Sequence, residues 1–124
     1  ILTPHKGEFK KIFYNLQNKV LDCFNASKLV SNIVLYKGND TVISSPNGNV
    51  WINSDASNSL ATAGSGDLLC GIISGLVAQK MKIDKSVLAA VCIQNDLSNR
   101  KKNVVVEDFL TDIQLVMNTI KNNN

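Results

Sequence analysis

A short run of small residues that ends in a carboxylate is the segment best suited to phosphate chemistry. Gly64-Ser65-Gly66-Asp67 stands directly before a long apolar run. Glycines before a helix expose consecutive backbone N–H groups, and the helix dipole adds partial positive charge, so the segment can hold a phosphate. Asp67 would repel that phosphate, but beside a substrate hydroxyl it could act as a general base. Alternatively, Asp67 only caps the helix and the glycines allow a tight turn.

A second candidate is the polar run Lys37-Gly38-Asn39-Asp40-Thr41, which lies between two β-branched runs. Lys37 could meet a phosphate as a compact charge, and Gly38 could let a ligand approach the backbone. An ordinary surface turn would have the same composition, so this run carries weight only together with the other segments.

His5, the single histidine, follows the apolar residues of a predicted strand end and precedes a helical pattern. Strand ends that face a loop are where α/β folds place ligand contacts, and a neutral imidazole could bind a substrate hydroxyl or amide. A lone loop histidine without any role is the competing interpretation, and Glu8 could merely complement the start of the following helix.

The pattern of apolar residues predicts the elements that must position these segments. We expect helices over residues 7–16 and 18–30, then strands over 33–36, 41–44 and 49–53, with Asn47-Gly48 as the turn of a hairpin. A long helix should begin at Gly66 or Asp67 and be buried on most sides, with Gly71, Ser74 and Gly75 letting neighbouring backbones come close. A polar loop over residues 54–59 should precede it.

Two further helices are expected toward the end of the chain. Asp84 or Ser86 can cap the first of them. A basic cluster at residues 100–102 should complement the dipole of its last turn rather than bind nucleic acid. The last helix should carry on one face Phe109, Ile113, Val116 and Ile120.

Composition narrows the class of protein. With 124 residues, of which 44% are hydrophobic and 19% charged, the chain can hold one globular core, and its net charge of +3 is modest. Cys23, Cys70 and Cys92 form no Cys-x-x-Cys pair, so a structural zinc is not indicated and a reduced, cytoplasmic setting is expected. The apolar run over residues 68–78 is shorter than the roughly 20 residues of a membrane span.

The sequence also excludes two common nucleotide-binding motifs and indicates an incomplete fold. It contains neither a Gly-x-x-x-x-Gly-Lys-Ser/Thr loop nor a Gly-x-Gly-x-x-Gly fingerprint, so neither a P-loop enzyme nor a Rossmann dehydrogenase is supported. Residues 1–4 read as the end of a strand, which suggests that the chain begins inside a fold. The predicted order of elements suits the trailing half of a layered α/β fold.

Three segments in a fixed order resemble the NAD(P)H-hydrate dehydratase family of ribokinase-like proteins. They are Leu-Thr-Pro-His-x-Gly-Glu-Phe at residues 2–9, Leu-x-Lys-Gly-x-Asp-Thr-Val-Ile at 35–43, and Leu-Ala-Thr-Ala-Gly-Ser-Gly-Asp at 60–67. The resemblance implies the C-terminal half of a single ribokinase-like domain, a three-layer α/β/α sandwich. The resemblance covers roughly residues 1–90. The alternative hypothesis is a ribokinase-like kinase of a vitamin precursor or sugar, which the first of the three segments disfavours.

The resemblance implies an activity and a set of site residues. A nucleotide, ADP or ATP, would phosphorylate the ring hydroxyl of hydrated NADH or NADPH, and loss of phosphate would restore the double bond. His5 and Asp67 would contact the hydrated dinucleotide, with Asp67 as the base. Magnesium would accompany the nucleotide phosphates, without a dedicated metal cage in this chain. A homo-oligomer is expected, and the nucleotide site would be lined by Lys37, Gly38, Asn39, Asp40, Thr41 and Gly66.

The sequence departs from the family pattern in places. Lys6 replaces the usual proline of His-Pro-Gly-Glu, so the loop loses a fixed φ. The family fold ordinarily needs about twice this length, and without its other half we expect the isolated chain to be poorly active or to persist only as an inactive fragment.

Overall fold

The computed structural model describes residues 1–14, 16–54, 63–100, 110 and 112–118. It divides the chain into two compact units, Ile1–Ala56 and Ser57–Asn124. Each unit has its own secondary structure and buried residues. The assignment of the whole chain to one domain stays a prediction.

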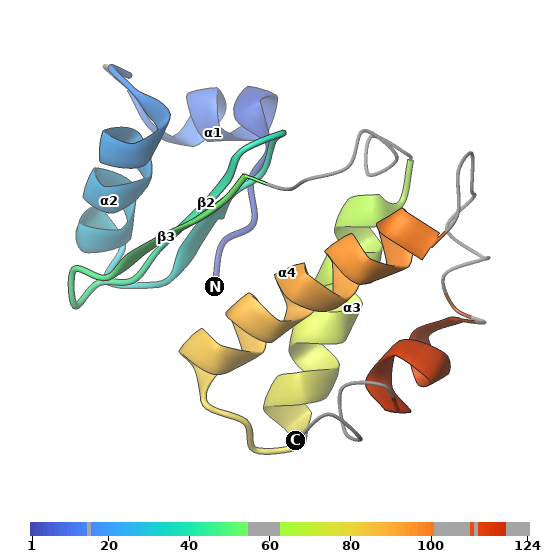
Figure 1. Cartoon of the computed structure of the whole chain (residues 1–124). Coiled ribbons are helices and arrows are strands. Elements are labelled where there is room, and N and C mark those ends of the chain that lie inside the picture. Colours follow the sequence, from blue (N-terminus) through green and yellow to red (C-terminus); the bar gives the residue numbers. More distant parts are fainter. Residues whose placement is uncertain (15, 55–62, 101–109, 111, 119–124) are drawn as a thin grey trace. The chain divides into compact units, whose positions relative to one another are not determined.

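The first unit places two helices and a short N-terminal segment on a three-stranded sheet (Figure 1). Its strands run antiparallel in the order β1-β2-β3, and Leu2 adds a parallel bridge to Val34 on the outer side of β1. The three predicted strands and the helix over 18–30 are therefore confirmed. The elements are α1 (Lys6–Ile12), α2 (Lys19–Leu29), β1 (Val34–Tyr36), β2 (Thr41–Ser44) and β3 (Val50–Asn53).

Local signals in the sequence explain these boundaries. The side chain of Asn18 accepts a hydrogen bond from the Leu21 backbone and caps α2. Gly48 has a φ of 100°, a conformation that a residue with a Cβ rarely adopts, so the turn between β2 and β3 needs this glycine.

Helix α1 ends earlier than its apolar spacing predicted. Phe13 has extended backbone at the C-cap, so the helix stops at Ile12 and does not reach Leu16. The two phenylalanines explain the misleading period: Phe9 and Phe13 are both buried, with ring centroids 4.6 Å apart, while Ile12 is half exposed. Phe13 is buried although its backbone is extended, so the spacing between Phe9 and Phe13 does not require another helical turn.

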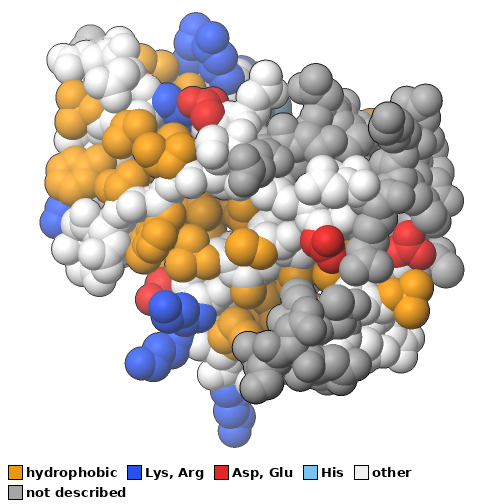
Figure 2. Space-filling model, in the orientation of Figure 1, with side chains coloured by type: hydrophobic (Ala, Val, Ile, Leu, Met, Phe, Trp, Pro, Cys, Tyr) orange, Lys and Arg blue, Asp and Glu red, His pale blue; other side chains and the backbone are white. Residues whose placement is uncertain are grey.

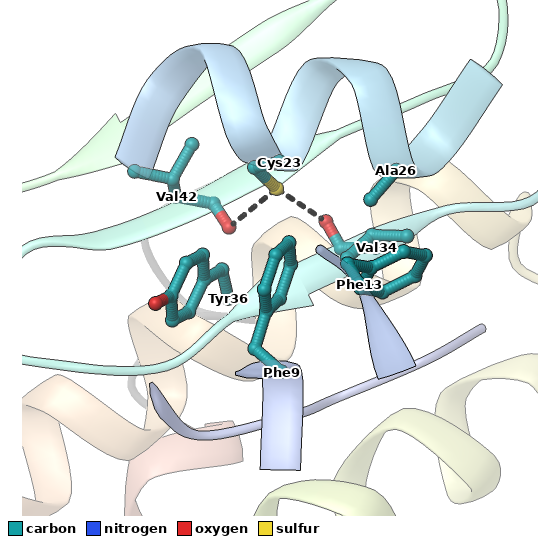
Figure 3. Close-up of a cluster of buried hydrophobic side chains, with 7 residues drawn as sticks. All are labelled: Phe9, Phe13, Cys23, Ala26, Val34, Tyr36 and Val42. Atoms are coloured by element: carbon teal, nitrogen blue, oxygen red, sulfur yellow. Dashed lines mark hydrogen bonds between the residues drawn. The ribbon is translucent and has the colours of Figure 1, made fainter. Parts of the chain in front are cut away.

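A compact aromatic and aliphatic core holds the first unit together (Figure 3). The rings of Phe9 and Tyr36 stack at a centroid distance of 4.0 Å with nearly parallel planes, which links α1 to β1. Cys23 on α2 is fully buried, and its Sγ lies 3.3 Å from the Val34 carbonyl oxygen and 3.4 Å from that of Val42. These contacts join α1 to β1, and α2 to β1 and β2.

The second unit consists of helices. Helix α3 (Ser65–Ala78) packs against α4 (Ile83–Arg100), and residues 110 and 112–118 are also helical. The buried residues of α3 recur on one face, and Val87, Ala90 and Leu97 are buried on α4. Val116 of the predicted last helix is buried as expected, whereas Phe109, Ile120 and the side chains of the basic cluster at 100–102 lie outside the described residues, as does the loop over 55–59.

The expectation that α3 is buried on most sides is wrong. Gly71, Ser74 and Gly75 are exposed, and a Cβ added at either glycine would meet nothing within 4 Å. The helix buries one face against α4, so its small residues do not bring another backbone close within the described part of the chain. None of the described helices combines the length and apolar character of a membrane span.

Candidate functional site

The segment before α1 is fixed against the edge of β1 by backbone hydrogen bonds. The amide of Leu2 donates to the Ile33 carbonyl at 2.9 Å, and the amide of Leu35 donates to the Leu2 carbonyl at 2.8 Å. The amide of Lys37 then donates to the Pro4 carbonyl at 2.9 Å, just after β1 ends. This parallel pairing places His5 beside the end of β1 that carries Lys37.

His5 is the N-cap of α1 and forms a reciprocal capping box with Glu8. The Glu8 amide donates to His5 Nδ1 at 3.1 Å, and the His5 amide donates to Glu8 Oε2 at 2.8 Å. Because Nδ1 accepts a hydrogen bond, the proton of the neutral imidazole resides on Nε2. The ring is largely exposed, so Nε2–H can donate to an acceptor on a ligand.

The carboxylate of Glu8 lies between two of the predicted site residues. Its Oε1 is 3.6 Å from His5 Nε2, and its Oε2 is 4.0 Å from Lys37 Nζ. The hydrogen bond from the His5 backbone, together with the positive charge of Lys37, holds the pKa of Glu8 below its usual value. The structure thus brings His5 and Lys37 together around a carboxylate that sequence reasoning had treated as a helix-dipole residue.

The turn from Lys37 to Thr41 joins β1 to β2 and is held at two points. The hydroxyl of Thr41 donates to the Gly38 carbonyl at 3.0 Å, which closes the turn from inside. Lys19, at the start of α2, donates to the Asp40 carbonyl at 2.5 Å and reaches its carboxylate Oδ1 at 2.9 Å. Gly38, Asn39 and Asp40 are exposed, so the outer side of the turn is accessible to a ligand.

Lys19 is a residue of this region that the sequence analysis missed. It stands in none of the three motifs, and 21 positions separate it from Asp40. Only the packing of α2 against β1 and β2 brings its ammonium group to the turn.

The start of α3 has the geometry expected of an anion site. Gly64 is its N-cap with a φ of 83°, and the first helical hydrogen bond runs from the Leu68 amide to the Gly64 carbonyl at 3.0 Å. The amides of Gly66 and Asp67 therefore have no acceptor within the helix. The helix start has no side-chain cap hydrogen bond, and the side chain of Asp67 is exposed. The Ser65 carbonyl accepts a hydrogen bond from Gln94 of α4 at 2.7 Å, which anchors the first turn.

The predicted residues fall into two groups. His5 and the turn from Lys37 to Thr41 belong to the first unit, where they are neighbours. Gly66 and Asp67 belong to the second unit. Their participation in one site stays a prediction.

An apolar groove on the first unit does not fit the chemistry of a phosphate. It has a volume of about 150 Å³ and lies between α1 and α2, with Phe13, Tyr14 and Leu29 among its lining residues. Figure 2 shows hydrophobic side chains gathered on its visible face. Of the residues that line the groove, Tyr14 and Leu29 are exposed. No lysine or arginine is found among the described residues that line this groove, so we do not assign the nucleotide to it.

Comparison with known proteins decides the family. The sequence profile described as NAD(P)H-hydrate dehydratase matches residues 1–121 of the chain. The chain belongs to the NAD(P)H-hydrate dehydratase family. The matched residues belong to both units and include all three of the motifs on which the resemblance rested.

Curated relatives of this dehydratase family carry matching names. The bifunctional NAD(P)H-hydrate repair enzyme of Synechocystis is 41% identical over 86 residues, which are 68% of this chain and 16% of that protein. The ADP-dependent (S)-NAD(P)H-hydrate dehydratase of Bacillus subtilis is 40% identical over 97 residues, 73% of this chain and 35% of that protein. The matched region of this chain thus spans about a third or less of the length of these relatives.

Solved structures show the fold of the dehydratase family in this chain. A crystal structure of the ADP/ATP-dependent NAD(P)H-hydrate dehydratase from Bacillus subtilis, co-crystallised with ATP and Mg²⁺ and soaked with CoA, superposes with a TM-score of 0.86. The alignment has 24% identity and covers 95% of this chain and 48% of that one. The chain is therefore an α/β structure that corresponds to about half of the ribokinase-like dehydratase fold.

Proposed function

We propose that this chain contributes to the ADP- or ATP-dependent dehydration of hydrated NADH or NADPH. The observation that carries the proposal is the family match over residues 1–121. The matched residues include the start of α3, where the exposed side chain of Asp67 lies beside two amides that have no acceptor within the helix. Relatives of the chain are named for this reaction, and one solved neighbour was crystallised with ATP and Mg²⁺.

In this mechanism Asp67 accepts the proton of the ring hydroxyl while the hydroxyl oxygen attacks the terminal phosphoryl group of the nucleotide, whose bridging P–O bond breaks to release AMP from ADP or ADP from ATP. A carboxylate at hydrogen-bond distance of the hydroxyl is a suitable general base for such an attack. The C–O bond of the new phosphate ester then breaks and releases inorganic phosphate. Loss of a proton from the neighbouring ring carbon forms the double bond. Phosphorylation is useful because hydroxide is a poor leaving group and phosphate is a good one.

The remaining site residues have binding roles. The amide of Gly66 and the dipole of α3 stabilise the negative charge of the transferred phosphoryl group. Lys37 and the turn through Gly38, Asn39, Asp40 and Thr41 bind the nucleotide. His5 donates Nε2–H to an oxygen of the hydrated dinucleotide.

Magnesium accompanies the nucleotide in this proposal. We expect the ion to be bound mainly by the phosphates themselves, as Mg²⁺ commonly is with nucleotides. Among the described residues, no group of three or more His, Cys, Asp or Glu side chains could hold a metal. Bound to the phosphates, Mg²⁺ would neutralise their charge. We also propose a cytoplasmic setting, which suits a chain whose three cysteines are thiols, and a homo-oligomeric assembly, which light scattering would measure.

Substitution of Asp67 tests the proposal. In the full-length protein we expect Asp67→Asn to lower kcat by about 10²- to 10⁴-fold, because general-base catalysis contributes on that order, while nucleotide binding is retained. The matched control is Asp84→Asn, since Asp84 occupies the first turn of α4 as Asp67 does in α3, and it should leave kcat unchanged.

Two results would contradict the proposal. Unchanged turnover of the Asp67→Asn protein would remove this residue from the mechanism. A stable phosphorylated product, in place of released inorganic phosphate, would instead indicate a ribokinase-like small-molecule kinase.

A further inference from the structure

Lys19 lies outside the three family motifs and donates two hydrogen bonds to the proposed nucleotide turn. Its ammonium group contacts both the carbonyl and the carboxylate of Asp40, and it lies 5.0 Å from the centroid of the Tyr36 ring. Only 21% of the Lys19 side chain is exposed. A lysine that is fixed by three contacts and mostly covered has a defined position, unlike a mobile surface lysine.

The charge of Asp40 explains why such a contact matters for a nucleotide. A free carboxylate within a phosphate-binding turn would repel the ligand. Lys19 neutralises this carboxylate, and its hydrogen bond holds the pKa of Asp40 below the usual value. The turn then presents its exposed outer side to a phosphate without an unpaired negative charge.

Gly38 provides independent geometric support. Its φ lies outside the left-handed region, so the turn does not need glycine for its backbone conformation. A Cβ at this position would instead collide with Lys19 Nζ. The missing side chain of Gly38 therefore makes room for the ammonium group of Lys19, and the two residues fit each other across α2 and the turn.

We propose that Lys19 is a positioning residue of the nucleotide site, which acts by fixing the turn from Lys37 to Thr41 and by neutralising Asp40. This inference rests on the proposed function, because it assumes that the turn binds ADP or ATP. It adds a residue that none of the three motifs contains.

Calorimetric titration of the full-length protein with ADP and with ATP tests the proposal. We expect Lys19→Met to weaken nucleotide binding about tenfold, since it leaves Asp40 unpaired. The double substitution Lys19→Met with Asp40→Asn should bind more tightly than Lys19→Met alone, because the unpaired carboxylate is gone. The KM for the nucleotide should rise with Lys19→Met, while the KM for the hydrated dinucleotide should stay constant.

Lys28→Met is the matched control. Lys28 also belongs to α2 and also lies over an aromatic ring, 5.6 Å from the Phe24 centroid, but its Nζ lies near Gly48, in the turn between β2 and β3. Its substitution should leave nucleotide affinity unchanged. Should Lys19→Met not fold, Lys19→Gln carries the same test, because it keeps a hydrogen-bond donor and removes the charge.

The outcomes distinguish the proposed role of Lys19 from the proposed dehydratase function. A folded Lys19 variant that binds nucleotide as the wild type does would overturn the role of Lys19, even if its melting temperature falls. Failure of the double substitution to recover any affinity would overturn the neutralisation of Asp40. A wild-type protein that binds neither ADP nor ATP would overturn both proposals.

Discussion

Glu8 contacts His5 and Lys37 at once, although these residues were assigned to different ligands. His5 is expected to face the hydrated dinucleotide and Lys37 the nucleotide, and the Glu8 carboxylate lies 3.6 Å from the first and 4.0 Å from the second. In the transfer of a phosphoryl group the two ligands must lie in a fixed mutual orientation. Because the Glu8 carboxylate contacts one residue of each binding region, it can fix the position of His5 relative to Lys37.

Cys23 gives a prediction about pH. Burial raises the pKa of this thiol from 9.0 to about 11, so the folded state keeps its proton at a pH where the unfolded state has lost it. We therefore expect the free energy of unfolding to fall as the pH rises from 9 to 11, with the Cys23 contribution complete below that window. Urea unfolding at several pH values measures this.

The control for this prediction is Cys23→Ala, because this variant lacks the thiol and keeps every other ionisable group of the chain. The dependence on pH should be shallower in the variant than in the wild type. Identical slopes would mean that Cys23 does not contribute.

Individual site residues were predictable to different degrees. The glycines and Asp67 at the start of α3 could be located because helix starts and phosphate-binding runs have local signatures. The contact between Lys19 and Asp40 could not, since it joins residues 21 positions apart and depends on how α2 packs against the sheet. The position of Glu8 between His5 and Lys37 likewise required the parallel pairing of Leu2 with β1.

At the scale of secondary-structure elements, α3 contains glycines with opposite roles. Gly64 has a φ of 83° at the N-cap, whereas Gly71 lies in the helix with open space around it. We expect Gly64→Ala to lower the free energy of unfolding by about 1–2 kcal/mol, because left-handed backbone is costly for a residue with a Cβ. Thermal and urea unfolding of the chain measure this change.

Gly71→Ala is the control on the same helix. At an exposed helical position alanine should stabilise by up to about 1 kcal/mol relative to glycine. A destabilising Gly71→Ala would show that the exposed face of α3 is in contact with another part of the protein, and a neutral Gly64→Ala would contradict the requirement for glycine at the N-cap.

The elements themselves were largely predictable where the signal was local. Asn18 as the cap of α2 and Asn47-Gly48 as the turn between β2 and β3 both act within a few residues. The end of α1 was not predictable, because apolar spacing cannot distinguish a helical turn from an extended residue that is buried nearby, as Phe13 is. The exposed face of α3 was not predictable either, because small residues such as Gly71 can face solvent as well as another backbone.

At the scale of the whole molecule, length governs the expected activity. The chain covers 48% of the solved Bacillus subtilis dehydratase to which its fold corresponds. We therefore expect residues 1–124 alone to turn over hydrated NADH or NADPH poorly, because the remaining part of that fold would supply the rest of a pocket. Release of inorganic phosphate by the purified 124-residue chain measures this, and turnover equal to that of the Bacillus subtilis enzyme under the same conditions would refute it.

The pairing of Leu2 with Val34 has a consequence for the order in which the first unit folds. The antiparallel pairs β1-β2 and β2-β3 join strands close in sequence, whereas the bridge from Leu2 closes a loop of roughly thirty residues that contains α1 and α2. Closing this loop costs chain entropy that the hairpins do not incur, so we expect the N-terminal segment to dock after them and to detach first. In this order His5 would reach Lys37 only at that step. We therefore expect the part of the site formed by His5 and Lys37 to be the last part of the unit to form.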